Sequence, residues 1–143
     1  MALRILWLDN DPLYIKAYVN ALEDRGDKVD IATSVTDAEQ SLNNHTYNLI
    51  IIDAMIPTLS EEEEREYPPE DTDRGLKLGV FFYKRIVGIT KVPVLAMTVR
   101  LDETIRNEFK QAGLPEQAFT TKLSVRKIAS FLDKVDSLAA KAI

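Results

Sequence analysis

Hydrophobic residues occur along the chain both in short continuous runs and in longer stretches with helical spacing. The short runs predict buried strands at residues 3–8, 49–52 and 92–97. Four consecutive branched aliphatic residues at 49–52 are typical of the centre of a parallel sheet, where both faces of a strand are buried. Apolar and polar residues alternate at 28–32, and the apolar signal at 118–121 is weak. These two segments are therefore predicted to be edge strands.

An amphipathic stretch follows each predicted strand. Ile15, Tyr18, Val19 and Leu22, for example, have the spacing that places side chains on one face of a helix, and Gly26 is a typical helix-ending residue. The five predicted helices span residues 12–26, 34–44, about 73–87, 101–113 and 124–142.

Strands and helices thus alternate along the whole chain, an order typical of a parallel sheet covered by helices on both faces. We expect the most apolar strands at the centre and the more polar ones at the edges, which gives the strand order 2-1-3-4-5. This order defines a flavodoxin-like α/β fold, a doubly wound five-stranded sheet with five helices in a three-layer α/β/α sandwich. Because 143 residues allow one sizeable core, residues 1–143 are expected to form a single domain.

The composition excludes several kinds of site. The chain has no cysteine, so disulfides and thiol nucleophiles are excluded, and its single histidine, His45, cannot form a multi-histidine metal site. The amino-terminal residues do not resemble a signal peptide, and no apolar run is long enough to span a membrane. We therefore expect a cytoplasmic protein without a membrane partner.

The net charge of −5 is concentrated in one segment. Residues 61–73 contain eight acidic residues and one arginine, a net charge of −7, which leaves the remainder of the chain at about +2. A broad basic face that would bind nucleic acid is therefore not expected. We interpret residues 58–72 as an acidic insertion after the third strand. Such a segment is either a solvated loop or a lid that repels anionic small molecules from the neighbouring strand end.

Polar side chains stand where the predicted strands end. Asp9 follows the first strand, Asp53 the third, Thr98 the fourth and Lys122 the fifth. Each has an ordinary explanation alone, such as a helix cap or a surface charge. Together, at one edge of a parallel sheet, they have the groups needed to handle phosphate. Carboxylates can hold Mg²⁺ or attack phosphorus, while a hydroxyl and an ammonium group can neutralise the phosphoryl oxygens.

The segments ILWLDNDP, LIIIDAMIP, VLAMT and TK, in this order, resemble the motifs of response-regulator receiver domains over essentially the whole chain. The resemblance implies that Asp53 is phosphorylated by a phosphohistidine donor. It also implies that Asp9, Asn10 and Asp53 hold Mg²⁺, together with the backbone carbonyl of Met55.

In the same family, the residues at the positions of Thr98 and Lys122 bind the phosphoryl oxygens, and Phe119 occupies the position of a switch aromatic. The resemblance thus implies a stand-alone receiver of two-component signalling that is not an enzyme beyond its own phosphorylation and dephosphorylation. A histidine kinase or histidine phosphotransfer protein would be its donor. An unidentified protein would bind the face formed by the fourth helix, the fifth strand and the fifth helix, and a homodimer is also left open.

The sequence departs from the family pattern at three places. Asn10 stands where the family has an acid, so we expect weaker Mg²⁺ binding unless Asp11 compensates. Leu123 stands where a proline usually follows the lysine, which affects the loop before the last helix. The acidic insertion lengthens a connection that is normally short.

These departures leave two alternative functions open. One is a pseudo-receiver, an interaction module that takes no phosphate. The other is a phosphatase, because Asp9-Asn10-Asp11 also resembles the nucleophile motif of haloacid-dehalogenase-like enzymes. That family needs a further acidic motif at a strand end after the lysine, whereas Asp133 and Asp136 fall inside a predicted helix.

Overall fold

The computed structural model describes residues 2–9, 12–53, 78–98, 103–121 and 128–140, and the following statements concern these residues. The strands are β1 (Arg4–Leu8), β2 (Lys28–Ala32), β3 (Leu49–Asp53), β4 (Val94–Thr98) and β5 (Phe119–Thr121). The helices are α1 (Pro12–Asp24), α2 (Val35–Asn44), α5 (Leu78–Ile86), α6 (Glu103–Gln111), the short 3₁₀ helix η1 (Glu116–Ala118) and α7 (Ile128–Ala140).

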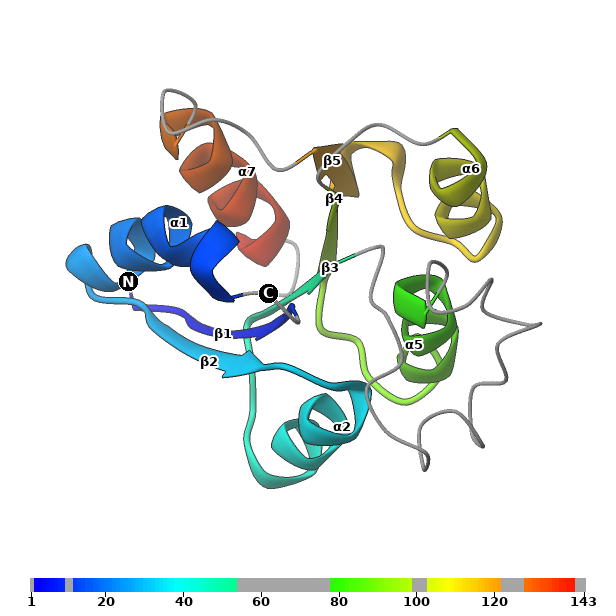
Figure 1. Ribbon diagram of the computed structural model, residues 1–143, viewed down its shortest axis with the longest axis horizontal. Coiled ribbons are helices and arrows are strands. Elements are labelled where there is room, and N and C mark those ends of the chain that lie inside the picture. The colour runs from blue at the N-terminus through cyan, green and yellow to red at the C-terminus, as the bar shows by residue number, and fades with distance from the viewer. Residues whose placement is uncertain (1, 10–11, 54–77, 99–102, 122–127, 141–143) are drawn as a thin grey trace.

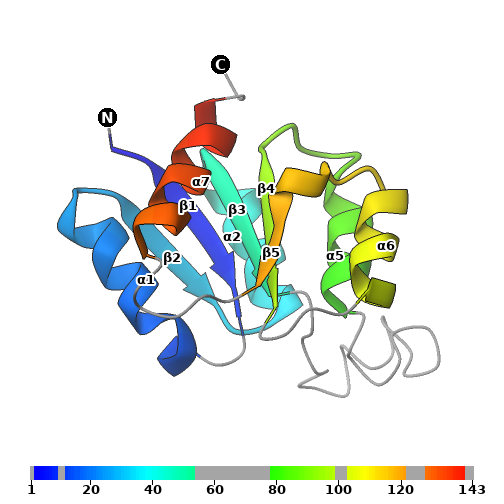
Figure 2. The ribbon, with the colours of Figure 1, turned by 90° about the horizontal axis from the view of Figure 1, so that it is seen from above.

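The five strands form one parallel sheet in the order β2-β1-β3-β4-β5 (Figures 1 and 2). This confirms the predicted order and places the two more polar strands at the edges. β3 and β4 are fully buried, as their continuous apolar sequences predict, whereas β2 has exposed and half-buried positions. The central strands β3 and β4 are therefore buried on both faces, and the edge strand β2 is not.

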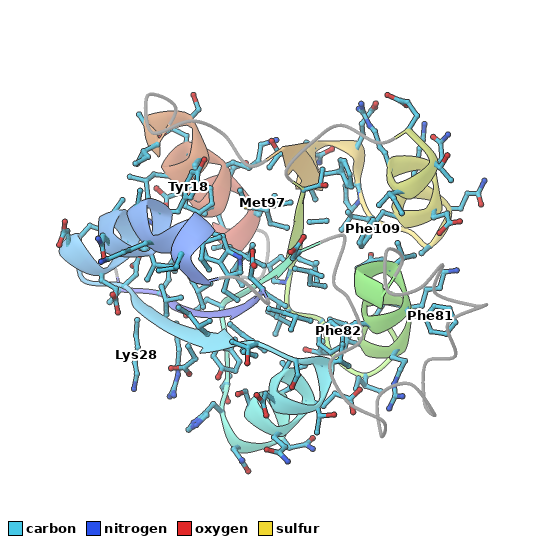
Figure 3. The ribbon with its side chains drawn as sticks, in the orientation of Figure 1. Tyr18, Lys28, Phe81, Phe82, Met97 and Phe109 are labelled. Carbon is cyan, nitrogen blue, oxygen red and sulfur yellow. The ribbon has the colours of Figure 1, made fainter. Side chains whose placement is uncertain are left out.

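Helices cover both faces of the sheet, with α1 and α7 on one side and α2, α5 and α6 on the other (Figure 1). On the first face, the ring of Trp7 in β1 stacks on Phe131 of α7 at 5.6 Å between centroids, and the ring of Tyr18 in α1 lies 5.0 Å from Phe131. On the second face, α5 directs Phe82 toward the interior while Phe81 points outward (Figure 3). The three-layer sandwich is thus filled by side chains from both sets of helices.

Local signals explain where the helices begin and end. The hydroxyl of Ser34 accepts a hydrogen bond from the backbone N–H of Asp37 at 3.1 Å and caps α2. Gly26 and Gly113 follow α1 and α6 with φ angles of 101° and 106°, which residues with a side chain rarely adopt. Both glycines therefore end helices as the sequence predicts.

The described boundaries differ from the predicted ones by a few residues. β4 begins at Val94, after Pro93, which has no backbone N–H to donate to a ladder. Ala118 belongs to η1 instead of the fifth strand, because its backbone N–H donates to the carbonyl of Pro115 at 2.9 Å. Within the described residues, no helix is long and apolar enough to cross a membrane.

Candidate functional site

Asp9 and Asp53 lie side by side at the carboxyl edge of the sheet. The register of β1 and β3 pairs Leu8 with Ile52, and Asp9 and Asp53 are the residues that directly follow this pair. Neighbouring strands are separated by about 4.8 Å, which brings the two backbones close together. Asp9 is fully buried and Asp53 is 5% exposed. Two carboxylates in such proximity repel each other when both are ionised, so the pair favours a cation.

Thr98 extends the same edge toward β5. Asp53 pairs with Met97 in the register of β3 and β4, and Thr98 follows directly as the last residue of β4. Thr98 is fully buried and pairs with Thr121, the last residue of β5. The sequence-predicted order Asp9, Asp53, Thr98 is therefore an order of neighbours in space.

Phe119 shares a sheet face with Thr98. Phe119 pairs with Ala96, and alternation along β4 places Ala96 and Thr98 on the same face. The Phe119 ring lies 5.8 Å from that of Phe109 in α6, so this face is the one that α6 covers. Thr98 and Phe119 therefore lie on neighbouring strands and on the face of the sheet that α6 covers.

The donor atoms at this edge fit Mg²⁺. That ion takes oxygen ligands, commonly one or two carboxylates, and keeps several waters. Asp9 and Asp53 supply two buried carboxylates from adjacent strands. Within the described ranges, no group of three or more histidine, cysteine, aspartate or glutamate side chains forms a richer metal site.

The other predicted site residues lie outside the described residues. They are Asn10, Asp11, Met55 and Lys122. Leu123 and the acidic insertion at 58–72 also lie there. Their roles remain predictions from the sequence.

The structure adds residues behind the candidate switch that the sequence analysis had not connected with it. The rings of Tyr83 in α5 and Phe109 in α6 lie 5.7 Å apart, and Phe109 in turn contacts Phe119. Figure 3 shows Phe109 on the side of α6 that faces the sheet. Helical spacing could place Phe109 on an apolar face, but its contact with Phe119 depends on how α6 packs on β5.

Comparison with known proteins links this architecture to one group of solved structures. No family model and no curated protein matches the sequence. The receiver domain of the Francisella response regulator 1452 is 19% identical, with a TM-score of 0.72 and 99% of each chain covered. The BeF₃-activated receiver domain of Klebsiella pneumoniae RstA is 14% identical, with a TM-score of 0.72 over 95% of this chain and 97% of that one.

A third similar structure is a CheY-like response-regulator receiver domain from Methanospirillum hungatei JF-1. It is 17% identical, with a TM-score of 0.70 and 99% of each chain covered. Sequence identities this low carry information about the fold only. The coverage shows that the likeness in fold extends over nearly all of the chain. Together with the strand order and the helices on both faces, these likenesses show that the chain has the fold of a response-regulator receiver domain.

Proposed function

We propose that this chain is a receiver that accepts a phosphoryl group on Asp53 and signals through protein contacts. The observation that supports this most is the register at the carboxyl edge, where buried Asp9, Asp53 and Thr98 are neighbours on adjacent strands. In open α/β sheets, ligands bind at the carboxyl ends of the strands, which form this edge. The donor in this proposal is a phosphohistidine of a histidine kinase or a histidine phosphotransfer protein.

In the proposed transfer, a carboxylate oxygen of Asp53 attacks the phosphorus atom of the phosphohistidine. The phosphorus–nitrogen bond breaks, an acyl phosphate forms on Asp53, and the released imidazole takes up a proton from solvent. Asp9 and Asp53, with Asn10 and the Met55 carbonyl, would hold Mg²⁺, which neutralises phosphoryl charge when bound. The Thr98 hydroxyl would donate a hydrogen bond to a phosphoryl oxygen, and Lys122 would supply a positive charge.

The output surface in this proposal consists of α6, β5 and α7. Thr98 would move toward the new phosphoryl group, and Phe119 would follow because the two residues share a face of the sheet. Phe109 then transmits the change to α6. A downstream protein that binds this surface would distinguish the phosphorylated from the unphosphorylated chain by its different affinity for the two forms.

The decisive experiment compares the Asp53→Asn variant with the unmodified chain in labelling by a phosphorylated histidine phosphotransfer protein and Mg²⁺. We expect complete loss of labelling, since an amide cannot form the acyl phosphate. Asp133→Asn changes an exposed aspartate on α7 in the same way and should label normally. Labelling that persists in Asp53→Asn would refute the assignment of the phosphoacceptor.

A pseudo-receiver is the second candidate, favoured by Asn10 and Leu123, which depart from the family pattern. Beryllofluoride, a phosphoryl mimic, separates the two hypotheses. Mg²⁺-dependent beryllofluoride binding that Asp53→Asn removes supports the receiver, whereas the absence of binding in the unmodified chain supports the pseudo-receiver. For a phosphatase that uses Asp9, the later acids are poorly placed, because Asp133 and Asp136 lie within α7.

A further inference from the structure

A cavity of about 280 Å³ lies at the end of the sheet opposite to Asp53 and Thr98. It is formed where α5 ends, β4 begins, η1 approaches and α7 passes. Its apolar walls include Ile86, Val92, Val94, Leu114, Ala118 and Leu138. The cavity is thus separated from the proposed phosphorylation site by the length of β4.

The size and lining of the cavity suit a small organic ligand. A dry cavity of about 150 Å³ can hold benzene, and typical ligand pockets begin at about 300 Å³. A ligand with one ring or a short alkyl chain therefore fits the apolar part. Val87 and Ile89, in the turn after α5, are 48% and 78% exposed, which extends the apolar surface close to the cavity.

Few polar groups accompany these walls. Among the described lining residues, Lys91 is the only charged one, and it is exposed to solvent. Thr90 and Tyr83 also contribute to the lining. Burial raises the pKa of Tyr83 above its ordinary value, which already keeps a tyrosine hydroxyl neutral at pH 7. An apolar pocket with one cation complements a molecule that has an apolar body and one negative charge.

The cavity is also connected to the candidate switch. Tyr83 lines the cavity and contacts Phe109, whose ring lies 5.8 Å from that of Phe119. Leu114 lines the cavity as well and follows directly after Gly113, which ends α6. A ligand that displaces Tyr83 or Leu114 therefore acts on residues that pack against Phe119 or hold the end of α6.

We propose that this cavity is a second ligand site, which takes a small monocarboxylate with an apolar body and transmits its occupancy to Phe119 through Tyr83 and Phe109. Binding of such a ligand would alter the surroundings of Phe119 without phosphorylation of the chain. Neither binding nor the response of Phe119 requires Asp53, so the proposal stands apart from the phosphoryl-transfer function.

The test is a titration of the full chain, without Mg²⁺, with sodium octanoate, followed by amide nuclear magnetic resonance. We expect saturable shifts at residues 86–94 and 114–118, and a further shift at Phe119. Octanol serves as the uncharged probe. The absence of saturable shifts with octanoate overturns the site, and saturation without any change at Phe119 overturns the transmission.

Two substitutions locate the binding. Lys91→Gln removes an exposed charge and should weaken octanoate binding about two- to fivefold, as expected for an exposed charge pair, without affecting octanol. Lys84→Gln is the matched control, because Lys84 is exposed on α5 and does not line the cavity.

Val92→Phe, at a half-buried position before β4, should fill the cavity and abolish the shifts from both probes. Unchanged octanoate affinity in Lys91→Gln refutes the carboxylate, and unchanged affinity in a folded Val92→Phe refutes the cavity.

Discussion

At the residue scale, Thr98 and the pair of Arg25 with Asp27 show two different uses of a buried polar group. Thr98 is buried at the end of a central strand, and in the proposed function its hydroxyl binds a phosphoryl oxygen. The Asp27 side chain is only 1% exposed and accepts hydrogen bonds from the backbone N–H of Leu3 at 2.9 Å and from Nε of Arg25 at 2.6 Å. We therefore expect a substitution at Thr98 to change the affinity for a phosphoryl mimic. A substitution that exposes Asp27 to the loss of its partner should change the free energy of unfolding.

Thr98→Val should weaken beryllofluoride binding in the presence of Mg²⁺ by about 10- to 100-fold. A hydrogen bond to a charged group contributes about 1.5–3 kcal/mol, and valine keeps the shape of threonine without its hydroxyl. Titration calorimetry measures the affinity. Thr46→Val is the control, since Thr46 is exposed before the amino end of β3, at the opposite end of that strand from Asp53, and its affinity should match that of the unmodified chain. Equal affinity in Thr98→Val would exclude the hydroxyl from the phosphoryl site.

Arg25→Ala should lower the free energy of unfolding by about 2 kcal/mol. The substitution leaves the buried carboxylate of Asp27 without its cation, and it also removes the contact between Arg25 and Asp136 of α7 at 2.7 Å. Urea denaturation measures this loss.

The matched control for Arg25 is Arg106→Ala. Arg106 pairs with Glu116, whose side chain is 64% exposed, so its loss should cost less than about 1 kcal/mol. If both variants lose the same stability, burial of Asp27 is not the reason for the effect.

At the scale of the elements, one polar cluster joins β1, β2 and the segment just before β3. Arg4 of β1 forms an ion pair with Asp30 of β2 at 3.0 Å, and the hydroxyl of Tyr47, just before β3, donates to Asp30 at 2.7 Å. The Arg4 guanidinium also lies 5.5 Å from the centre of the Tyr47 ring. The sheet thus has a structural cluster at one end and the candidate functional site at the other.

Tyr47→Phe should cost about 1.5 kcal/mol of stability at neutral pH, the contribution of a hydrogen bond to a carboxylate. Burial first, and then the hydrogen bond to Asp30, raise the pKa of Tyr47 to about 12. Because this pKa is raised in the folded state, the stabilisation is complete below the unfolded pKa of about 10 and is lost as the pH rises through about 12.

Denaturation at a series of pH values from 8 to 12 measures the difference between Tyr47→Phe and the unmodified chain. The difference should stay constant up to about pH 10 and shrink above it. A difference that does not change over this range would show that Tyr47 titrates alike in the folded and unfolded states.

At the scale of the whole molecule, charge is distributed very unevenly. Residues 61–73 carry a net −7, while the chain as a whole carries −5. This segment follows Asp53 in the chain, so we expect its field to act on anionic molecules that approach the proposed phosphorylation site.

Deletion of residues 59–72 should accelerate labelling of Asp53 by acetyl phosphate severalfold, because a repulsive charge is removed. A second variant, with Glu61 to Glu64 replaced by glutamine, keeps the length and tests the charge alone. The acceleration should diminish at high salt, because the Debye length falls to about 3 Å at 1 M ionic strength and more distant charges are screened. Unchanged rates and unchanged kinase preference would show that the segment does not control access.

The sequence by itself determined the order of elements, the central and edge strands and the candidate residues at the strand ends. These features follow from local patterns, since the period of apolar residues distinguishes strands from helices and continuous burial distinguishes β3 from β2. The resemblance to receiver motifs adds the roles expected for Asp53, Thr98 and Phe119.

Only the tertiary structure decided which of these residues are neighbours, and on which face. Strand register pairs Leu8 with Ile52 and Ala96 with Phe119, and a shift by one residue would reverse every face. The contacts of Arg25 with Asp136 and of Tyr83 with Phe109, and the cavity behind them, join segments that are distant in the chain. Such contacts depend on how helices pack on the sheet, which local periodicity does not specify, and so they became visible only in the folded chain.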